Sequence, residues 1–196
     1  MERERLTAFT DGVLAIIITI MVLELRPPHG ARFEDLVGLT PVFLSYVLSF
    51  VYVGIYWNNH HHFFQLVRQV DGAILWANLH LLFWLSMVPF TTAWMGENHF
   101  APAPTALYGV SLLMAAVAWT VMQSVIFRKQ GDHSVLREAL GRDLKAKISP
   151  LIYLAGIGLA FVWAPGAAIA YLAVALMWLV PDRRVERHIV AHHAQP

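Results

Sequence analysis

Residues 5–25 read RLTAFTDGVLAIIITIMVLEL, an aliphatic run that begins directly after an acidic residue. A single helix needs roughly 20 residues to cross the hydrocarbon core of a bilayer. The uncharged part extends only from Gly12 to Leu23, so a spanning helix must include Asp11 and reach Glu24. Because a carboxylate that faces lipid is costly, we expect Asp11 to face protein or water.

This helix has two different faces when its residues are placed about 100° apart on a wheel. Asp11 falls on nearly the opposite side from Ile16. One face is therefore almost purely aliphatic with a single hydroxyl, and the other carries an acid that needs partners. These features alone also fit an ordinary first transmembrane helix in which Asp11 has a structural role. The residues within roughly 60° of Ile16 are Arg5, Phe9, Gly12, Thr19, Ile20 and Leu23.

The composition is that of a membrane protein with several spans. Of the 196 residues, 58% are hydrophobic and only 14% are charged, and the mean hydropathy is +0.55. A net charge of +1 gives no basic surface for nucleic acid, and the absence of cysteine excludes disulfides and thiolate chemistry. The sequence has no nucleophile elbow, glycine-rich phosphate loop or paired membrane histidine motif. We therefore do not expect an enzyme.

We expect a single domain over residues 1–196 with six transmembrane helices. Apolar runs separated by polar or proline-rich connections predict the spans. A charged segment at 128–147, whose amphipathic pattern favours a helix on the membrane surface, and a tail at 181–196 connect or follow them. The expected spans are 5–25, 41–67, 73–94, 105–127, 149–163 and 167–180.

The distribution of basic residues predicts the orientation. Of the 14 Lys and Arg residues, all except Arg26 and Arg32 fall on one side of this topology. Cytoplasmic segments carry the excess of Lys and Arg in membrane proteins. We therefore expect a multi-pass protein of the cell membrane with both termini in the cytoplasm.

The start of the first helix resembles the signature of a known family. The pattern Arg5-x-x-x-Phe9-Thr10-Asp11, followed by an aliphatic helix, resembles the opening of the lysosomal/endosomal potassium channel family (transmembrane protein 175 type) and its small bacterial homologues. The usual residue between Phe and Asp in that family is serine, and Thr10 keeps the hydroxyl. The resemblance implies an all-α integral membrane protein in which six-helix subunits form a homotetramer and the first helix lines a central pore.

Three consecutive histidines, His60, His61 and His62, lie near the end of the second span. They spread over about 200° of a helix, so they cannot all bind one metal ion, and we predict no metal site. The pattern Trp57-x-x-His60 resembles a second pattern of the same family, which implies a polar network that locks the helices together. His61 or His62 could take the place of His60. The expected members are Arg5, Phe9, Thr10, Asp11, Trp57, His60 and Asn78.

The resemblance also implies the function. Carried over residue by residue, the family's pore positions are Ile16, Thr19 and Leu23, which lie on the aliphatic face of the wheel. Ile16 would form a hydrophobic constriction that excludes water, and Thr19 would supply a ring of four hydroxyls. The expected function is passive conduction of K⁺ through a homotetramer in the lipid bilayer, without a cofactor.

Two alternatives remain open from the sequence. One is a proton-permeable or weakly selective cation channel, which reversal potentials in K⁺, Na⁺ and pH gradients would distinguish from a potassium channel. The other is a non-conducting membrane scaffold, which would give no ion flux from purified tetramers in liposomes.

Overall fold

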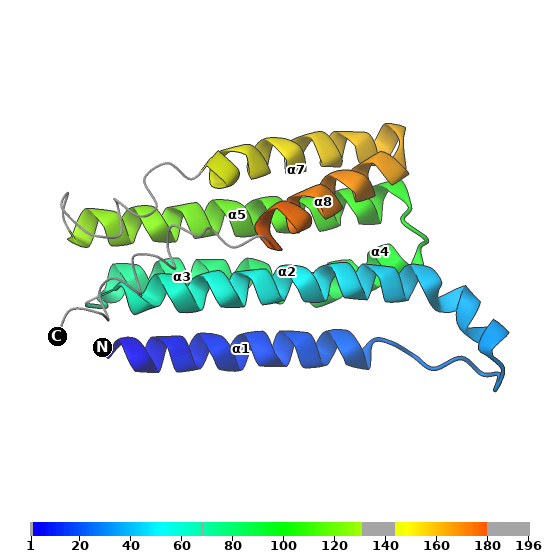
Figure 1. Ribbon diagram of the computed structural model, residues 1–196, viewed down its shortest axis with the longest axis horizontal. Helices are drawn as coiled ribbons and strands as arrows, with labels where there is room; N and C mark the ends of the chain where they lie inside the picture. Colours follow the sequence, from blue (N-terminus) through cyan, green and yellow to red (C-terminus); the bar gives the residue numbers. More distant parts are fainter. Residues whose placement is uncertain (1, 68, 131–143, 180–196) are drawn as a thin grey trace.

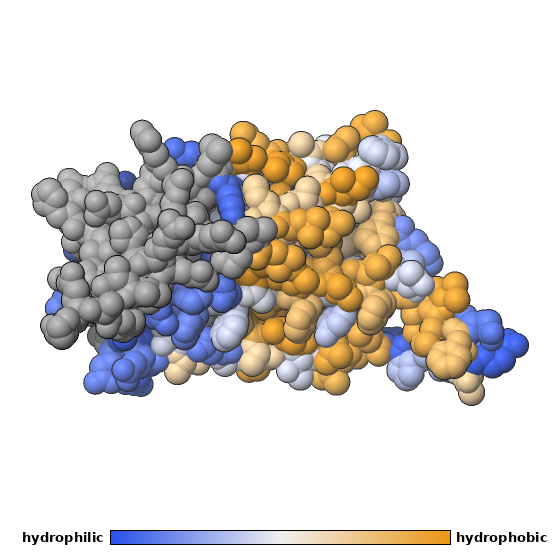
Figure 2. Space-filling view, in the orientation of Figure 1, coloured by the Kyte–Doolittle hydropathy of each residue, from blue (hydrophilic) through white to orange (hydrophobic). Residues whose placement is uncertain are grey.

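The computed structural model describes residues 2–67, 69–130 and 144–179, and every regular element in these residues is a helix. The all-α membrane fold is thus confirmed. Five helical segments are long and apolar enough to cross a membrane, and a sixth, α8 (Ala164–Leu179), is shorter. Figure 2 shows apolar side chains across the middle of the visible face and hydrophilic ones toward its ends.

The helices form a bundle with α1 (Arg3–Leu23) at one edge and α7 (Leu144–Val162) at the other (Figure 1). α1 packs against α2 (Thr40–Gln65), α3 (Gly72–Ser86) and α4 (Val88–Glu97). On the other side of the bundle, α5 (Pro102–Gln130) packs against α3, α7 and α8. The first helix is therefore covered on one side only.

The third span, expected over 73–94 with Pro89 as a kink or a helix start, is interrupted at Met87. α3 ends at Ser86 and α4 begins at Val88, with Pro89 in its first turn. Proline has no N–H to bond the carbonyl four residues earlier, and it is well accommodated at the start of a helix. The chain therefore ends one helix and starts another within a single span.

A short 3₁₀ helix, η1 (Phe33–Leu39), precedes α2 where the sequence predicted only a polar connection. The Asp35 side chain holds its start, because Oδ2 accepts a hydrogen bond from the backbone N–H of Arg32 at 3.0 Å. Pro41 then lies in the first turn of α2. The second span thus continues an existing helical turn.

The expected charged loop at 128–147 is shorter than predicted at both ends. α5 (Pro102–Gln130) extends three residues beyond the predicted 127, and α7 begins at Leu144 rather than 149 and contains Pro150. The predicted surface helix and the tail at 181–196 fall wholly or mainly on residues outside the described ones.

An ion pair holds α5 to the start of α3. Lys129 Nζ lies 2.7 Å from Asp71 Oδ2, while Asp71 Oδ1 accepts the backbone N–H of Ile74 and so caps α3. The hydrogen bond from Lys129 lowers the pKa of the Asp71 carboxyl below its usual value. Both side chains are partly exposed, so the ion pair contributes little to the stability of the fold. It connects the end of α5 to the start of α3.

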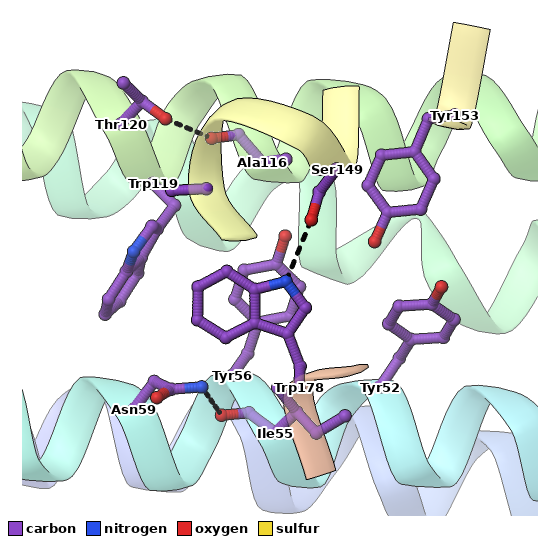
Figure 3. Close-up of a pocket in the computed structure, with 11 residues that line it drawn as sticks. Tyr52, Ile55, Tyr56, Asn59, Ala116, Trp119, Thr120, Ser149, Tyr153 and Trp178 are labelled. Atoms are coloured by element: carbon purple, nitrogen blue, oxygen red, sulfur yellow. Dashed lines mark hydrogen bonds between the residues drawn. The ribbon is translucent and has the colours of Figure 1, made fainter. Parts of the chain in front are cut away.

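The second half of the chain is joined to α2 by aromatic side chains around a small pocket between α2, α5, α7 and α8 (Figure 3). Trp178 Nε1 donates to Ser149 Oγ at 2.9 Å and so connects α8 to α7. The Tyr52 and Tyr153 rings lie 6.3 Å apart between α2 and α7, and the Tyr52 hydroxyl donates to the Tyr171 carbonyl of α8. These buried contacts fix α7 and α8 to the bundle.

Tyr171 needs a glycine opposite it, which gives a test of this packing. A Cβ at Gly109 would lie closer than 3.0 Å to the Tyr171 ring and to Ile157. We expect Gly109→Ala to lower the free energy of unfolding by about 1–3 kcal/mol, the usual cost of overpacking. The measurement is thermal unfolding of the purified protein in detergent.

Gly158→Ala is the matched control for this substitution. Gly158 also lies inside a spanning helix, but a Cβ there would meet nothing within 4 Å. Equal unfolding temperatures for the two variants would contradict the packing described here.

Candidate functional site

One face of α1 is buried in the bundle. Its buried residues recur every three or four positions, as expected for a single helix stripe. They pack with residues of α2, α3 and α5 in one hydrophobic core. The buried residues of α1 are Leu6, Thr10, Leu14, Ile17 and Met21.

The opposite face of α1 is exposed in the single chain. Ile16 is 59% exposed and Leu23 is 73% exposed, and Thr19 between them is also exposed. These are the three residues predicted to line the pore, and the structure brings them onto one open stripe. α1 itself lies at one edge of the bundle (Figure 1).

The hydroxyl of Thr19 has a defined orientation. Its Oγ1 donates to the backbone carbonyl of Ala15, one turn earlier, at 2.8 Å. A hydroxyl has one hydrogen to donate and two lone pairs to accept. With its hydrogen used inside the helix, Thr19 presents the oxygen as an acceptor on the exposed stripe, which suits contact with a cation or water.

A buried chain of hydrogen bonds joins α1, α3 and α2. Asn78 Nδ2 donates to Thr10 Oγ1 at 2.9 Å, and Asn78 Oδ1 lies 2.9 Å from His60 Nε2. All three side chains are buried. Because Asn78 Oδ1 can only accept, His60 Nε2 must carry a proton. His60 Nδ1 has no partner among the described residues, and the His60 ring stacks on Phe64 at 4.3 Å.

A second contact lies beside this chain at the surface of the bundle. Trp57 Nε1 of α2 donates to Asp11 Oδ1 at 3.1 Å, and Asp11 is half-buried. The carboxylate thus has a protein donor, as expected for an acid within a spanning helix. Together the two contacts attach α1 to α2 and α3 at adjacent positions.

The structure does not bring every predicted network residue together. Phe9 is 54% exposed and Arg5 is also exposed, and the Arg5 side chain has no hydrogen bond or ion pair with any described residue. Both lie on the same wheel face as Ile16, so they point away from the network. Within one chain Arg5 and Phe9 therefore lie apart from the network, and their membership of it stays a prediction.

Of the three histidines, His60 occupies the buried position. His61 lies at the surface, with its Nε2 3.0 Å from Gln65 Nε2 and its ring stacked on Trp57. His62 has a buried Nδ1 without a partner among residues 2–67, 69–130 and 144–179. The same residues contain no group of His, Cys, Asp or Glu that could hold a metal ion.

A second buried polar chain was not predicted. Ser49 Oγ of α2 lies 2.6 Å from Thr92 Oγ1 of α4 and 3.0 Å from Tyr108 Oη of α5. The signal was present as hydroxyl residues inside three apolar spans, which need partners where no water competes. The sequence does not show which of the many hydroxyls meet.

The chain is similar to several named proteins. It is 53% identical to a potassium channel of Chryseobacterium sp. (strain P1-3) over 189 residues, which cover 96% of this chain and 98% of the relative. The family model described as "Endosomal/lysosomal potassium channel TMEM175" matches residues 5–89. The chain belongs to the TMEM175 family. The family resemblance predicted from the sequence is thus confirmed, and the matched residues carry the exposed stripe and the network.

A solved structure matches this chain in fold, and a vertebrate relative carries a different name. The crystal structure of a lysosomal potassium-selective channel TMEM175 homologue from Chamaesiphon minutus matches with a TM-score of 0.79 and 26% identity, covering 91% of this chain and 97% of that one. The Homo sapiens relative, 30% identical over 116 residues, covers 53% of this chain and 23% of that protein, and is named an endosomal/lysosomal proton channel.

Asn78 is the residue of the network whose removal should cost most, because it bonds to both Thr10 and His60. Asn78→Leu leaves both partners buried without a hydrogen bond. We expect the free energy of unfolding to fall by about 1–3 kcal/mol for each stranded group. Thermal unfolding in detergent measures the effect.

Asn58→Leu serves as the control for Asn78→Leu. Asn58 lies on α2 close to His60 but is exposed. If both variants unfold at the same temperature, the buried chain does not hold α1 in place.

Proposed function

We propose that this chain forms a potassium-permeable channel whose pore is lined by α1 from four identical subunits. The observation that carries this proposal is the open stripe of Ile16, Thr19 and Leu23 on a helix that the rest of the chain covers on one side only. The names of the bacterial relatives support potassium as the permeant ion.

The position of α1 calls for several copies around an axis, and the family resemblance implies that there are four. One chain contributes one such helix at the edge of its bundle (Figure 1), and a single helix encloses nothing. Four copies around an axis bring four open stripes together and enclose a path.

Ile16 supplies the gate in this proposal. Four isoleucine side chains that converge on the axis form a narrow ring without polar groups, and such a constriction closes by losing its water. Leu23 forms a second apolar ring two turns further along the helix. Neither ring attracts a cation, so discrimination between ions must come from polar groups.

Thr19 supplies those polar groups. Its hydroxyl hydrogen is bonded to Ala15, so four Thr19 residues present four oxygens to the axis with their lone pairs free. Oxygens of this kind can replace part of the hydration shell of K⁺. The ring lies about one turn from the Ile16 constriction, where an ion loses much of its water.

The proposed location is the cell membrane with both termini in the cytoplasm. The start of α1, the start of α3 and the end of α5 meet at one end of the bundle (Figure 1), where most of the described basic residues lie. Arg26 and Arg32 lie in the connection at the other end. This charge bias supports a cytoplasmic location for the first end.

Conduction of protons or weakly selective conduction of cations is the second candidate. The vertebrate relatives are named proton channels, which is the observation that favours it. Reversal potentials of proteoliposomes in opposed K⁺, Na⁺ and pH gradients separate the two. A reversal potential that follows the pH gradient would show that protons, and not K⁺, are the permeant ion. The absence of any flux would favour a non-conducting scaffold.

Substitution of Ile16 tests the gate. Ile16→Ala widens the constriction and Ile16→Asn also wets it, so we expect K⁺ flux to rise in that order. Flux through proteoliposomes measures the effect. Leu154→Ala on α7, which is exposed to a similar degree but far along the chain from α1, is the control and should conduct as the parent does. Unchanged flux in both Ile16 variants would remove Ile16 from the pore.

Substitution of Thr19 tests the hydroxyl ring. Thr19→Val keeps the shape of the side chain but removes the oxygen, and the loss of about 1 kcal/mol of ion contact corresponds to roughly fivefold lower preference for K⁺ over Na⁺. Reversal potentials with K⁺ and Na⁺ measure this ratio. Thr120→Val is closely matched, because the Thr120 hydroxyl is also exposed and bonds the carbonyl four residues earlier at 2.9 Å. Equal ratios in the two variants would contradict the proposed role of Thr19.

A further inference from the structure

A groove runs between α5 and α7 on the outer surface, near the end of the bundle where α5 ends. Both helices are long and apolar enough to cross a membrane. It is separate from the α1 stripe, and neither the hydrogen-bond network nor the proposed pore uses it. Its main lining residues are Val117, Val121, Val125 and Arg128 of α5, with Lys147 and Pro150 of α7.

Valine side chains form most of the wall that α5 contributes to this groove. Val121 is 41% exposed along the groove. The two hydroxyls that also line it have no hydrogen left for an outside anion, because Thr120 donates to Ala116 O at 2.9 Å and Ser124 donates to Thr120 O at 2.8 Å. Such a wall suits a hydrocarbon chain and offers little to a soluble polar molecule.

The mouth of the groove is positively charged. Arg128 and Lys147 are both exposed, and neither side chain has an ion pair with any residue that the structure describes. The neighbouring Lys129 is already engaged, because it is paired with Asp71. Two cations without a counter-charge among the described residues thus lie at one end of an apolar groove.

We propose that this groove binds an anionic phospholipid. The phosphate lies between Arg128 and Lys147, and an acyl chain lies along the valines of α5. Basic pockets between transmembrane helices recognise anionic headgroups in this way, and the apolar wall adds the burial that a free anion cannot use. The inference goes beyond ion conduction and holds whether or not the tetramer conducts K⁺.

Native mass spectrometry of the full-length protein in detergent tests the proposal, with phosphatidylglycerol and phosphatidylcholine of identical acyl chains as probes. We expect phosphatidylglycerol to bind more tightly. The double variant Arg128→Gln/Lys147→Gln should weaken its binding roughly 25-fold, about fivefold for each charge removed. The control Arg26→Gln/Arg32→Gln removes two charges at the other end and should leave binding unchanged.

A second variant tests the apolar part without changing any charge. Val121→Trp fills the groove and should also weaken binding of phosphatidylglycerol, whereas Leu172→Trp on an exposed face of α8 should not. Inorganic phosphate at millimolar concentration should not displace the lipid.

Three results would overturn the proposal. The first is equal binding of the two lipids. The second is retention of phosphatidylglycerol by both groove variants. The third is displacement by inorganic phosphate, which would show a site for a free anion. None of these measurements depends on ion flux. A failure of the lipid proposal can therefore be distinguished from a failure of the channel proposal.

Discussion

The rotation of α1 about its own axis is determined by the hydrogen bonds that Asn78 makes to Thr10 and His60. A helix of aliphatic residues could pack on its neighbours in several rotations at similar cost, because lipid is as apolar as the protein interior. Thr10 and Asn78 are buried where water does not compete, so only one rotation satisfies them. That rotation buries Leu14 and Ile17 and leaves Ile16 and Thr19 open.

Buried contacts among the other helices hold the surface on which α1 packs. The hydroxyl chain of Ser49, Thr92 and Tyr108 joins α2 to α4 and α5, and the aromatic contacts around Tyr171 attach α7 and α8. Each helix that touches α1 is therefore itself held by buried polar or aromatic contacts. Because α1 is positioned by side chains on its buried face, residues on its open face can vary without loss of the fold.

The sequence predicted the helices and the open face of α1 because both depend on periodic patterns within one segment. It left open whether Pro89 kinks the third span or starts a new helix, because neighbouring helices decide between the two. The network was predicted in part. Asn78 and His60 form a hydrogen bond as expected. The family pattern places Arg5 in the network, whereas the helix wheel places it on the face of Ile16. In the single chain Arg5 is exposed, in agreement with the wheel. Pairings between distant hydroxyls, such as Ser49 with Thr92, depend on tertiary contacts that no local pattern records.

The central claim is that the open face of α1 lines a water-filled path, and cysteine accessibility tests it most directly. The chain has no cysteine, so Thr19→Cys introduces a single reactive thiol. A membrane-impermeant, charged thiol reagent should modify it in proteoliposomes and block K⁺ flux, with K⁺ slowing the reaction. Leu172→Cys, which is exposed on α8 and expected to face lipid, should react far more slowly and conduct normally. If the thiol at position 19 reacts no faster than the thiol at position 172, the open face of α1 does not line a pore.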